Sequence, residues 1–202
     1  MEKPLLATTL VLLLVCSPAW AQRSSLQYRG FNVNFDQINN SPRKNAILNS
    51  VKEQIDIVET AGLSKEVLDF FRTVPIVMLA DSSGTPGKYK RETKTVHLKG
   101  RDMAAEKPIL LHGFLHAYHN QRLPQGMKNK QVLDFYQEAE QAFPEFKGNQ
   151  YFLQNQGEFF AVTGSIYLFG NISRPPYNRQ NIREKMPLYY KYLAKLFGER
   201  RP

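Results

Sequence analysis

The sequence predicts an α+β domain, because segments with the period of a strand are separated and followed by segments with the period of a helix. In residues 29–36, Phe and Val alternate with polar residues, as in a strand with one buried face. A compact apolar run at residues 74–79 indicates a second, buried strand. Between them, apolar residues recur at near-helical spacing, namely Ile47, Val51, Ile55 and Val58.

The first predicted helix has recognisable start and stop signals. Ser41 is a suitable N-cap and Pro42 suits a first helical turn. Gly62 is expected to end this helix. A shorter helix is expected at residues 64–72, and residues 81–87 are rich in turn-forming residues.

Residues 89–101 predict a β-hairpin whose second strand covers residues 95–99. His97 lies within that strand between two apolar residues. Its side chain either lines a cleft or is an ordinary exposed strand residue, and alternation alone favours the exposed residue.

Residues 108–124 predict an amphipathic helix that carries two histidines four residues apart. His112 and His116 therefore lie on one helical face, at the spacing that a tetrahedral zinc ion needs from a single helix. In the zinc peptidase pattern H-E-x-x-H, the residue after the first His is the Glu that activates the metal-bound water. Here that residue is Gly113.

Two further helices are expected downstream, at residues 132–143 and in the segment that begins at Glu158. A carboxylate on a second helix is the usual third ligand when one helix supplies two His. Glu158 is therefore the candidate third ligand. A last helical stretch at residues 180–197 contains Pro187, which is expected to kink or divide it.

The pair HGFLHAYH and Glu158-Phe159-Phe160-Ala161 resembles the gluzincin zinc metallopeptidases related to the catalytic domain of anthrax lethal factor, including secreted bacterial members. The resemblance implies a zincin-like domain, with a small mixed sheet, an active-site helix carrying HxxxH and a second helix carrying Glu. It implies zinc bound by His112, His116 and Glu158. It also implies that Tyr151, seven residues before Glu158, stabilises the reaction oxyanion, and that an edge strand at residues 95–99 pairs with substrate.

Gly113 departs from the family pattern, because it removes the general base. Losing a positioned base typically costs a factor of about 10² to 10⁴ in rate. Three explanations stay open: a pseudoenzyme, an enzyme that uses another carboxylate, or a sequence change from a Glu codon. Glu138, Glu140 and Glu145 are the nearby substitute carboxylates in sequence.

Two aromatic side chains near the site have alternative roles. Tyr151 is either the oxyanion donor or a core tyrosine that packs its ring and bonds its hydroxyl. His119 is a poor third ligand, because it lies about 10 Å along the helix axis from His112. A surface position is the favoured prediction for His119.

Residues 1–21 have a basic start, an apolar core and a small-x-small end, which predicts a signal peptide followed by one domain at residues 22–202. We therefore expect a secreted or periplasmic protein without a membrane span in its mature chain. The only cysteine, Cys16, lies within the signal segment. The net charge of +9 comes from scattered Lys and Arg, which favours a soluble basic protein over a specific nucleic-acid partner.

The resulting hypothesis is a monomeric zinc metallopeptidase-like protein, weak or inactive in peptide hydrolysis, whose partner is a peptide or protein substrate or ligand. The alternative is a non-catalytic extracytoplasmic protein that holds a peptide or an envelope component in the former substrate groove.

Overall fold

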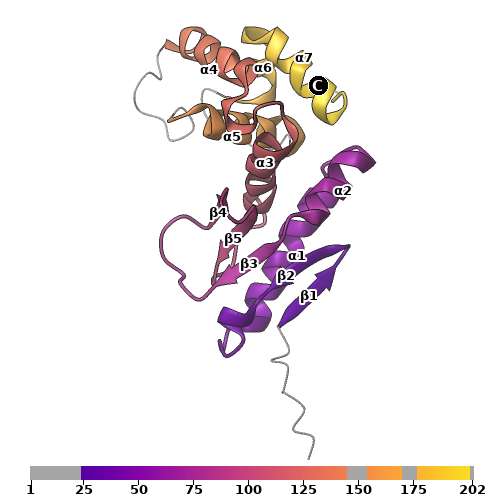
Figure 1. Ribbon diagram of the computed structural model, residues 1–202, viewed down its shortest axis with the longest axis vertical. Coiled ribbons are helices and arrows are strands. Elements are labelled where there is room, and N and C mark those ends of the chain that lie inside the picture. Colours follow the sequence, from indigo (N-terminus) through magenta and orange to yellow (C-terminus); the bar gives the residue numbers. More distant parts are fainter. Residues whose placement is uncertain (1–23, 145–153, 170–176, 201–202) are drawn as a thin grey trace, which may run out of the picture.

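The computed structural model describes residues 24–144, 154–169 and 177–200. A mixed sheet of five strands lies at one end of the molecule, together with the helices that pack on it (Figure 1). In spatial order the strands are β1 (Ser25–Tyr28), β2 (Phe31–Asn34), β3 (Ile76–Leu79), β5 (Thr95–Lys99) and β4 (Gly87–Lys90). The predicted signal segment lies outside the described residues.

The three central strands β2, β3 and β5 run parallel, whereas β1 and β4 pair antiparallel at the two edges. The predicted hairpin of β4 and β5 is confirmed. The expectation that residues 95–99 form the edge strand is wrong, because β5 pairs with β3 on one side and with β4 on the other. The edge strand of the hairpin is therefore β4. β1 adds a strand that was not expected from the sequence.

One face of the sheet is buried against helices, and its side chains form part of the core. The fully buried residues on this face are Phe31, Val33, Ile76, Met78, Val96 and Leu98. Three helices lie at this sheet, namely α1 (Lys44–Thr60), α2 (Lys65–Thr73) and α3 (Ile109–Arg122). Helix α2 contacts β2, α3 contacts β4 and β5, and α1 packs on α3. Since strand side chains alternate between faces, His97 points away from α3.

Local chemistry explains one helix start and one helix end in this half of the molecule. Ser64 caps α2, since its side chain accepts a hydrogen bond from the amide of Val67 at 3.3 Å. Gly62 follows α1 with φ +66°, a conformation that suits glycine at a helix end. The prediction that Ser41 caps α1 is wrong. The N-cap is Arg43, which provides no side-chain cap, and Ser41 bonds the Arg43 amide before the helix starts.

The metal-bearing helix α3 is fixed by apolar and polar contacts. The Phe114 ring lies between the rings of Phe31 and Phe71, with centroid distances of 5.5 and 5.1 Å. Gln54 of α1, fully buried, accepts a hydrogen bond from the Leu110 amide at 3.2 Å in the first turn of α3. Its Nε2 donates to the Lys107 carbonyl at 2.8 Å. Gln54 thus satisfies backbone groups that the start of a helix leaves unpaired.

The remaining described helices gather at the other end of α3, which runs between the two halves of the molecule (Figure 1). They are α4 (Lys130–Ala142), α5 (Gln156–Phe169), α6 (Arg179–Lys185) and α7 (Pro187–Phe197), and short 3₁₀ turns occur at Asp36–Ile38 and Gly126–Lys128. The expected division at Pro187 is confirmed, since Pro187 begins α7. Among the described helices, none combines the length and apolar character needed to cross a membrane.

Candidate metal centre

The helix α3 directs two imidazole rings toward the same point. His112 and His116 lie one helical turn apart, and their Nε2 atoms are 3.0 Å from each other. Their rings are nearly perpendicular, at 83°, with centroids 4.7 Å apart. Both side chains are partly accessible, 25% for His112 and 12% for His116. This accessibility leaves the paired nitrogens at the surface of a cleft.

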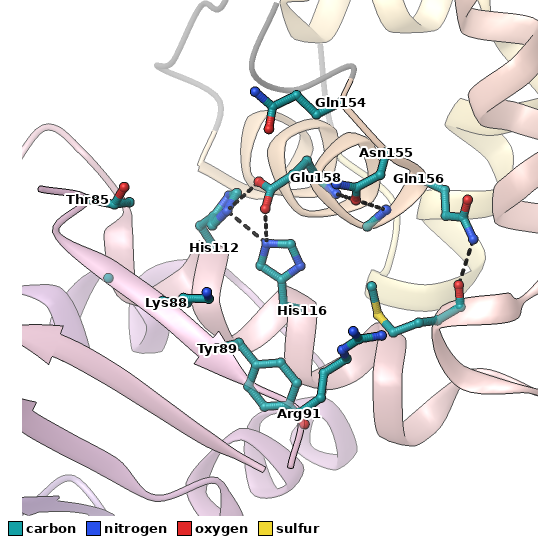
Figure 2. A pocket seen from close by; sticks show the side chains of 13 residues that line it. Thr85, Lys88, Tyr89, Arg91, His112, His116, Gln154, Asn155, Gln156 and Glu158 are labelled. Atoms are coloured by element: carbon teal, nitrogen blue, oxygen red, sulfur yellow. Dashed lines mark hydrogen bonds and ion pairs between the residues drawn. The ribbon is translucent and has the colours of Figure 1, made fainter. Parts of the chain in front are cut away.

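The first turn of α5 carries the third group, Glu158. Its Oε2 lies 3.3 Å from Nε2 of His112, and its Oε1 lies 3.3 Å from Nε2 of His116 (Figure 2). The Glu158 side chain is 19% accessible. Residues 46 positions apart in sequence therefore meet because α3 packs closely against α5.

This start of α5 is held by a local cap. Oδ1 of Asn155 accepts hydrogen bonds from the amides of Gly157 at 2.9 Å and Glu158 at 3.0 Å. The neighbouring Gln156 donates to the carbonyl of Met127 at 2.7 Å, which ties α5 to the turn after α3. The backbone of Glu158 is therefore fixed from both sides. Asn155 was not identified from the sequence, although an Asn three residues before a Glu is a typical N-cap signal.

The donor atoms lie close enough together to share one metal ion. Zinc ligands lie about 2.0–2.1 Å from the metal, so tetrahedral donors are separated by about 3.3 Å. The two Nε2 atoms are 3.0 Å apart, and each lies 3.3 Å from a different oxygen of Glu158. With one ligand atom taken from each residue, the three atoms lie within 4.8 Å of one another. Oε2 of Glu158 is buried and makes no hydrogen bond of good geometry. Two His and one Glu form a donor set that suits zinc with one open coordination position.

The electrostatics of Glu158 favour its charged form. Burial raises the pKa of this carboxyl, but hydrogen bonds and charge interactions with His112 and His116 outweigh burial and bring the pKa below its usual range. A carboxylate is the form that coordinates a metal. The cluster is thus ready to bind a cation at neutral pH without losing a proton from Glu158.

A cleft of about 560 Å³ opens onto the cluster. The described residues that line it are Thr85, Gly87, Lys88, Tyr89, Arg91, His112, His116, Met127, Gln154, Asn155, Gln156, Gly157 and Glu158. One wall comes from the edge strand β4 and the other from the start of α5 (Figure 2). The hydroxyl of Tyr89 accepts hydrogen bonds from Asn120 and Gln121, both at 3.0 Å, so β4 is tied to the end of α3.

Gly113 is explained by packing. A Cβ atom at this position would lie 2.9 Å from Cγ1 and 3.3 Å from Cγ2 of Val96 in β5. A Cβ atom could be accommodated only if Val96 or the backbone moved, and rotating a β-branched side chain exchanges one methyl for the other. The approach of helix α3 to strand β5 therefore favours glycine at this position. Val96 was not among the residues singled out in the sequence.

The other candidates from the sequence lie elsewhere. The prediction of a surface position for His119 is wrong, because its side chain is fully buried and packs on Phe160 with ring centroids 5.0 Å apart. His97 is half-buried on the far face of the sheet and does not line the cleft. Glu138 and Glu140 do not line it either. Tyr151 and Glu145 lie outside the described residues.

No protein-family model matches the chain, and no curated protein matches it. Among solved structures, the chain is similar to the Pro-Pro endopeptidase PPEP-2 from Paenibacillus alvei, with a TM-score of 0.54 and 19% identity over 82% of this chain and 97% of that one. At this identity the likeness concerns the fold. It confirms the expected α+β, zincin-like fold.

Proposed function

We propose that this protein binds one zinc ion through His112, His116 and Glu158 and holds an extended peptide in the adjoining cleft, with weak or no peptide hydrolysis. The observation that carries the proposal is the meeting of three metal-binding side chains, from two separate helices, at zinc-ligand distances beside an open cleft. The likeness of the fold to an endopeptidase supports a peptide as the ligand. We also propose that the protein is related to the lethal-factor-like gluzincins, on the motifs around His112 and Glu158.

The edge strand β4 supplies the peptide-binding surface. Among the described strands, β4 pairs only with β5, so its outer backbone groups face the cleft side and remain available. An extended peptide adds to such an edge through main-chain hydrogen bonds, and side-chain pockets then give specificity. Zinc, when bound, supplies a Lewis acid that polarises a carbonyl and acidifies water. The family resemblance assigns Tyr151 as the donor to the oxyanion.

The weak or absent hydrolysis follows from the missing base. Glu158 is the only carboxylate among the described residues that line the cleft, and it is engaged with both His. A side chain at position 113 would press against Val96, which would have to move. Without a positioned base, the expected rate loss is a factor of about 10² to 10⁴.

The second candidate is a purely non-catalytic peptide-binding protein that works outside the cytoplasm, as residues 1–21 predict. The close packing of Gly113 on Val96 favours it, because the neighbouring strand is adapted to the absence of a base. The two candidates share the cleft. They differ in whether peptide binding depends on zinc, which only the first candidate requires.

The test of the metal site is the zinc content of the chain, purified without chelator or a metal-binding tag. We expect about one zinc per chain, and a loss of zinc in His116→Ala and in Glu158→Gln. His97→Ala is the matched control, since His97 faces away from the site, and it should retain zinc. Absence of zinc from the unmodified chain under zinc-replete conditions would overturn the proposal.

Hydrolysis is then measured on a peptide library that includes Pro-Pro sequences. We expect turnover near the background set by Glu158→Gln. A rate for the unmodified chain that lies well above this background and equals that of Gly113→Glu/Val96→Ala, in which a base is restored and given space, would contradict the weak-enzyme interpretation. Binding without cleavage in both proteins would favour the non-catalytic candidate.

A further inference from the structure

The charged side chains that line the cleft are unevenly distributed. Lys88 and Arg91, both exposed, belong to the edge strand and the residue that follows it. Neither makes an ion pair or side-chain hydrogen bond within the described part of the chain. The one acidic side chain there, Glu158, contacts His112 and His116. The cleft therefore carries excess positive charge, and zinc binding would increase it.

The opposite wall does not offset this charge. Gln154, Asn155 and Gln156 are neutral amides, and they lie across the cleft from Lys88 and Arg91 (Figure 2). A carboxylate on a peptide between the walls thus meets cationic groups on the strand side and hydrogen-bonding groups on the helix side. Charge complementarity of this kind raises the rate of encounter and discriminates against cationic ligands.

The spacing of the two cations restricts the ligand further. Lys88 and Arg91 are three residues apart, and a strand rises about 3.3 Å per residue, so they are separated along the edge by about 10 Å. A peptide added to β4 has the same rise per residue. Side chains three positions apart along a strand project from opposite faces, so two acidic side chains of the peptide would face these cations when they are likewise three positions apart.

We propose that the cleft selects extended peptides with two acidic side chains spaced three residues apart, and that Lys88 and Arg91 determine this specificity. This inference rests on the proposed function, because it assumes that β4 and the metal centre form one peptide-binding cleft. Each exposed charge pair contributes an enrichment of about two- to five-fold. The enrichment falls as salt is added, since the groups are solvent-accessible.

The chain provides a matched control for Lys88. Lys90 lies two residues along the same strand, so it projects from the same face, and it is equally exposed. Lys90 does not line the cleft. Replacing Lys90 by Glu changes the net charge by the same amount as Lys88→Glu, so the two variants separate a local effect from the overall charge of +9.

The experiment uses the full zinc-loaded chain, immobilised and exposed to a degenerate decapeptide library, with recovered peptides sequenced by position. We expect Asp and Glu to be enriched over Asn and Gln about two- to five-fold at two positions at 50 mM salt, and much less at 500 mM. Lys88→Glu and Arg91→Glu should each lose one enriched position. Lys90→Glu should retain both.

Two results would overturn the inference and leave the proposed function standing. One is recovery of peptides without acidic enrichment. The other is enrichment that Lys88→Glu, Arg91→Glu and Lys90→Glu reduce equally, which would assign the effect to net charge. Recovery of no peptide above a blank support, by a chain that does contain zinc, would overturn both this inference and the peptide-binding part of the proposed function.

Discussion

A Cβ atom placed on Gly113 would lie 2.9 Å from Cγ1 of Val96, so the residue at the position of the catalytic base and a residue of the neighbouring strand determine each other. An interpretation of Gly113 as an isolated loss of Glu is therefore incomplete. The strand would also have to change before a longer side chain could be accommodated. We therefore predict that the effect of Gly113→Ala on stability changes sign when Val96 is replaced by Ala.

We expect Gly113→Ala to destabilise the protein by up to about 2 kcal/mol, because overpacking costs about 1–3 kcal/mol and the gain in helix propensity returns about 1 kcal/mol. In a Val96→Ala background the same change should stabilise by up to about 1 kcal/mol, since the nearest remaining atom, Cβ of residue 96, lies at an ordinary 3.7 Å. Urea unfolding of the four proteins of this cycle measures both values. Equal effects in the two backgrounds would show that Val96 does not restrict position 113.

The cap at Asn155 should couple stability to metal binding. Asn155→Ala removes the acceptor for the amides of Gly157 and Glu158, and we expect a loss of about 1 kcal/mol in unfolding free energy. Because the cap orients the backbone of a proposed ligand, zinc affinity should also fall, by up to about tenfold. Competition with a chromogenic chelator measures this affinity, and Asn155→Asp should restore it.

The matched control for that cap is Asn178, whose Oδ1 accepts from the Asn181 amide at 2.7 Å at the start of α6. Asn178→Ala should cost similar stability and leave zinc affinity unchanged. If both variants weaken zinc binding equally, the effect comes from general destabilisation and the orienting role of Asn155 is wrong.

The buried His119 should make stability depend on pH. Burial, with a smaller contribution from the charge of His116, lowers the pKa of His119 to about 4, whereas an unfolded His titrates near about 6.5. Between these values the unfolded chain binds a proton that the folded chain does not. The contribution of neutral His119 to the free energy of unfolding is therefore fully present above about pH 6.5. As the pH drops toward about 4, the free energy of unfolding decreases by about 2–3 kcal/mol.

The measurement is urea unfolding across this pH range, with a chelator present so that metal release does not contribute. His119→Leu should show a shallower decline than the unmodified chain, because other titrating groups are common to both. If the stability of both proteins declined equally with pH, His119 would bind its proton as readily in the folded chain as in the unfolded chain, and the predicted lowering of its pKa would be wrong.

Gln54 is expected to be a major determinant of the position of α3. Gln54→Leu leaves the buried Leu110 amide without its acceptor, and an unsatisfied buried group costs about 1–3 kcal/mol. The carbonyls of Ala104 and Lys107 lose one donor each but keep a backbone donor. We expect a loss of about 1–3 kcal/mol in urea unfolding. Gln37 is the control, because its side chain accepts from the Ala80 amide at an exposed position, where water replaces it. Gln37→Leu should cost less than about 1 kcal/mol.

The local chemistry of the sequence was sufficient to predict most elements. The strand at Phe31, the buried run at Ile76, the helix through His112 and the break at Pro187 depend on side-chain period, glycine and proline, which act over a few residues. The i,i+4 spacing on α3 likewise brings two imidazoles together without help from the rest of the chain. The assignment of Glu158 as third ligand needed a family pattern, because no local feature of the sequence relates His112 to a residue 46 positions away.

Long-range packing decided the features that the sequence did not determine. In the sheet, β5 pairs with β3, so β4 forms the edge. Either strand of the hairpin could have paired with β3, and local sequence does not determine which one does. The burial of His119 followed from contact with α5, although its neighbours in sequence are polar. Gly113 could be read as a missing base from the sequence alone. Only the approach of β5 to α3 explains why glycine is favoured there, because steric crowding depends on atoms that tertiary structure brings together.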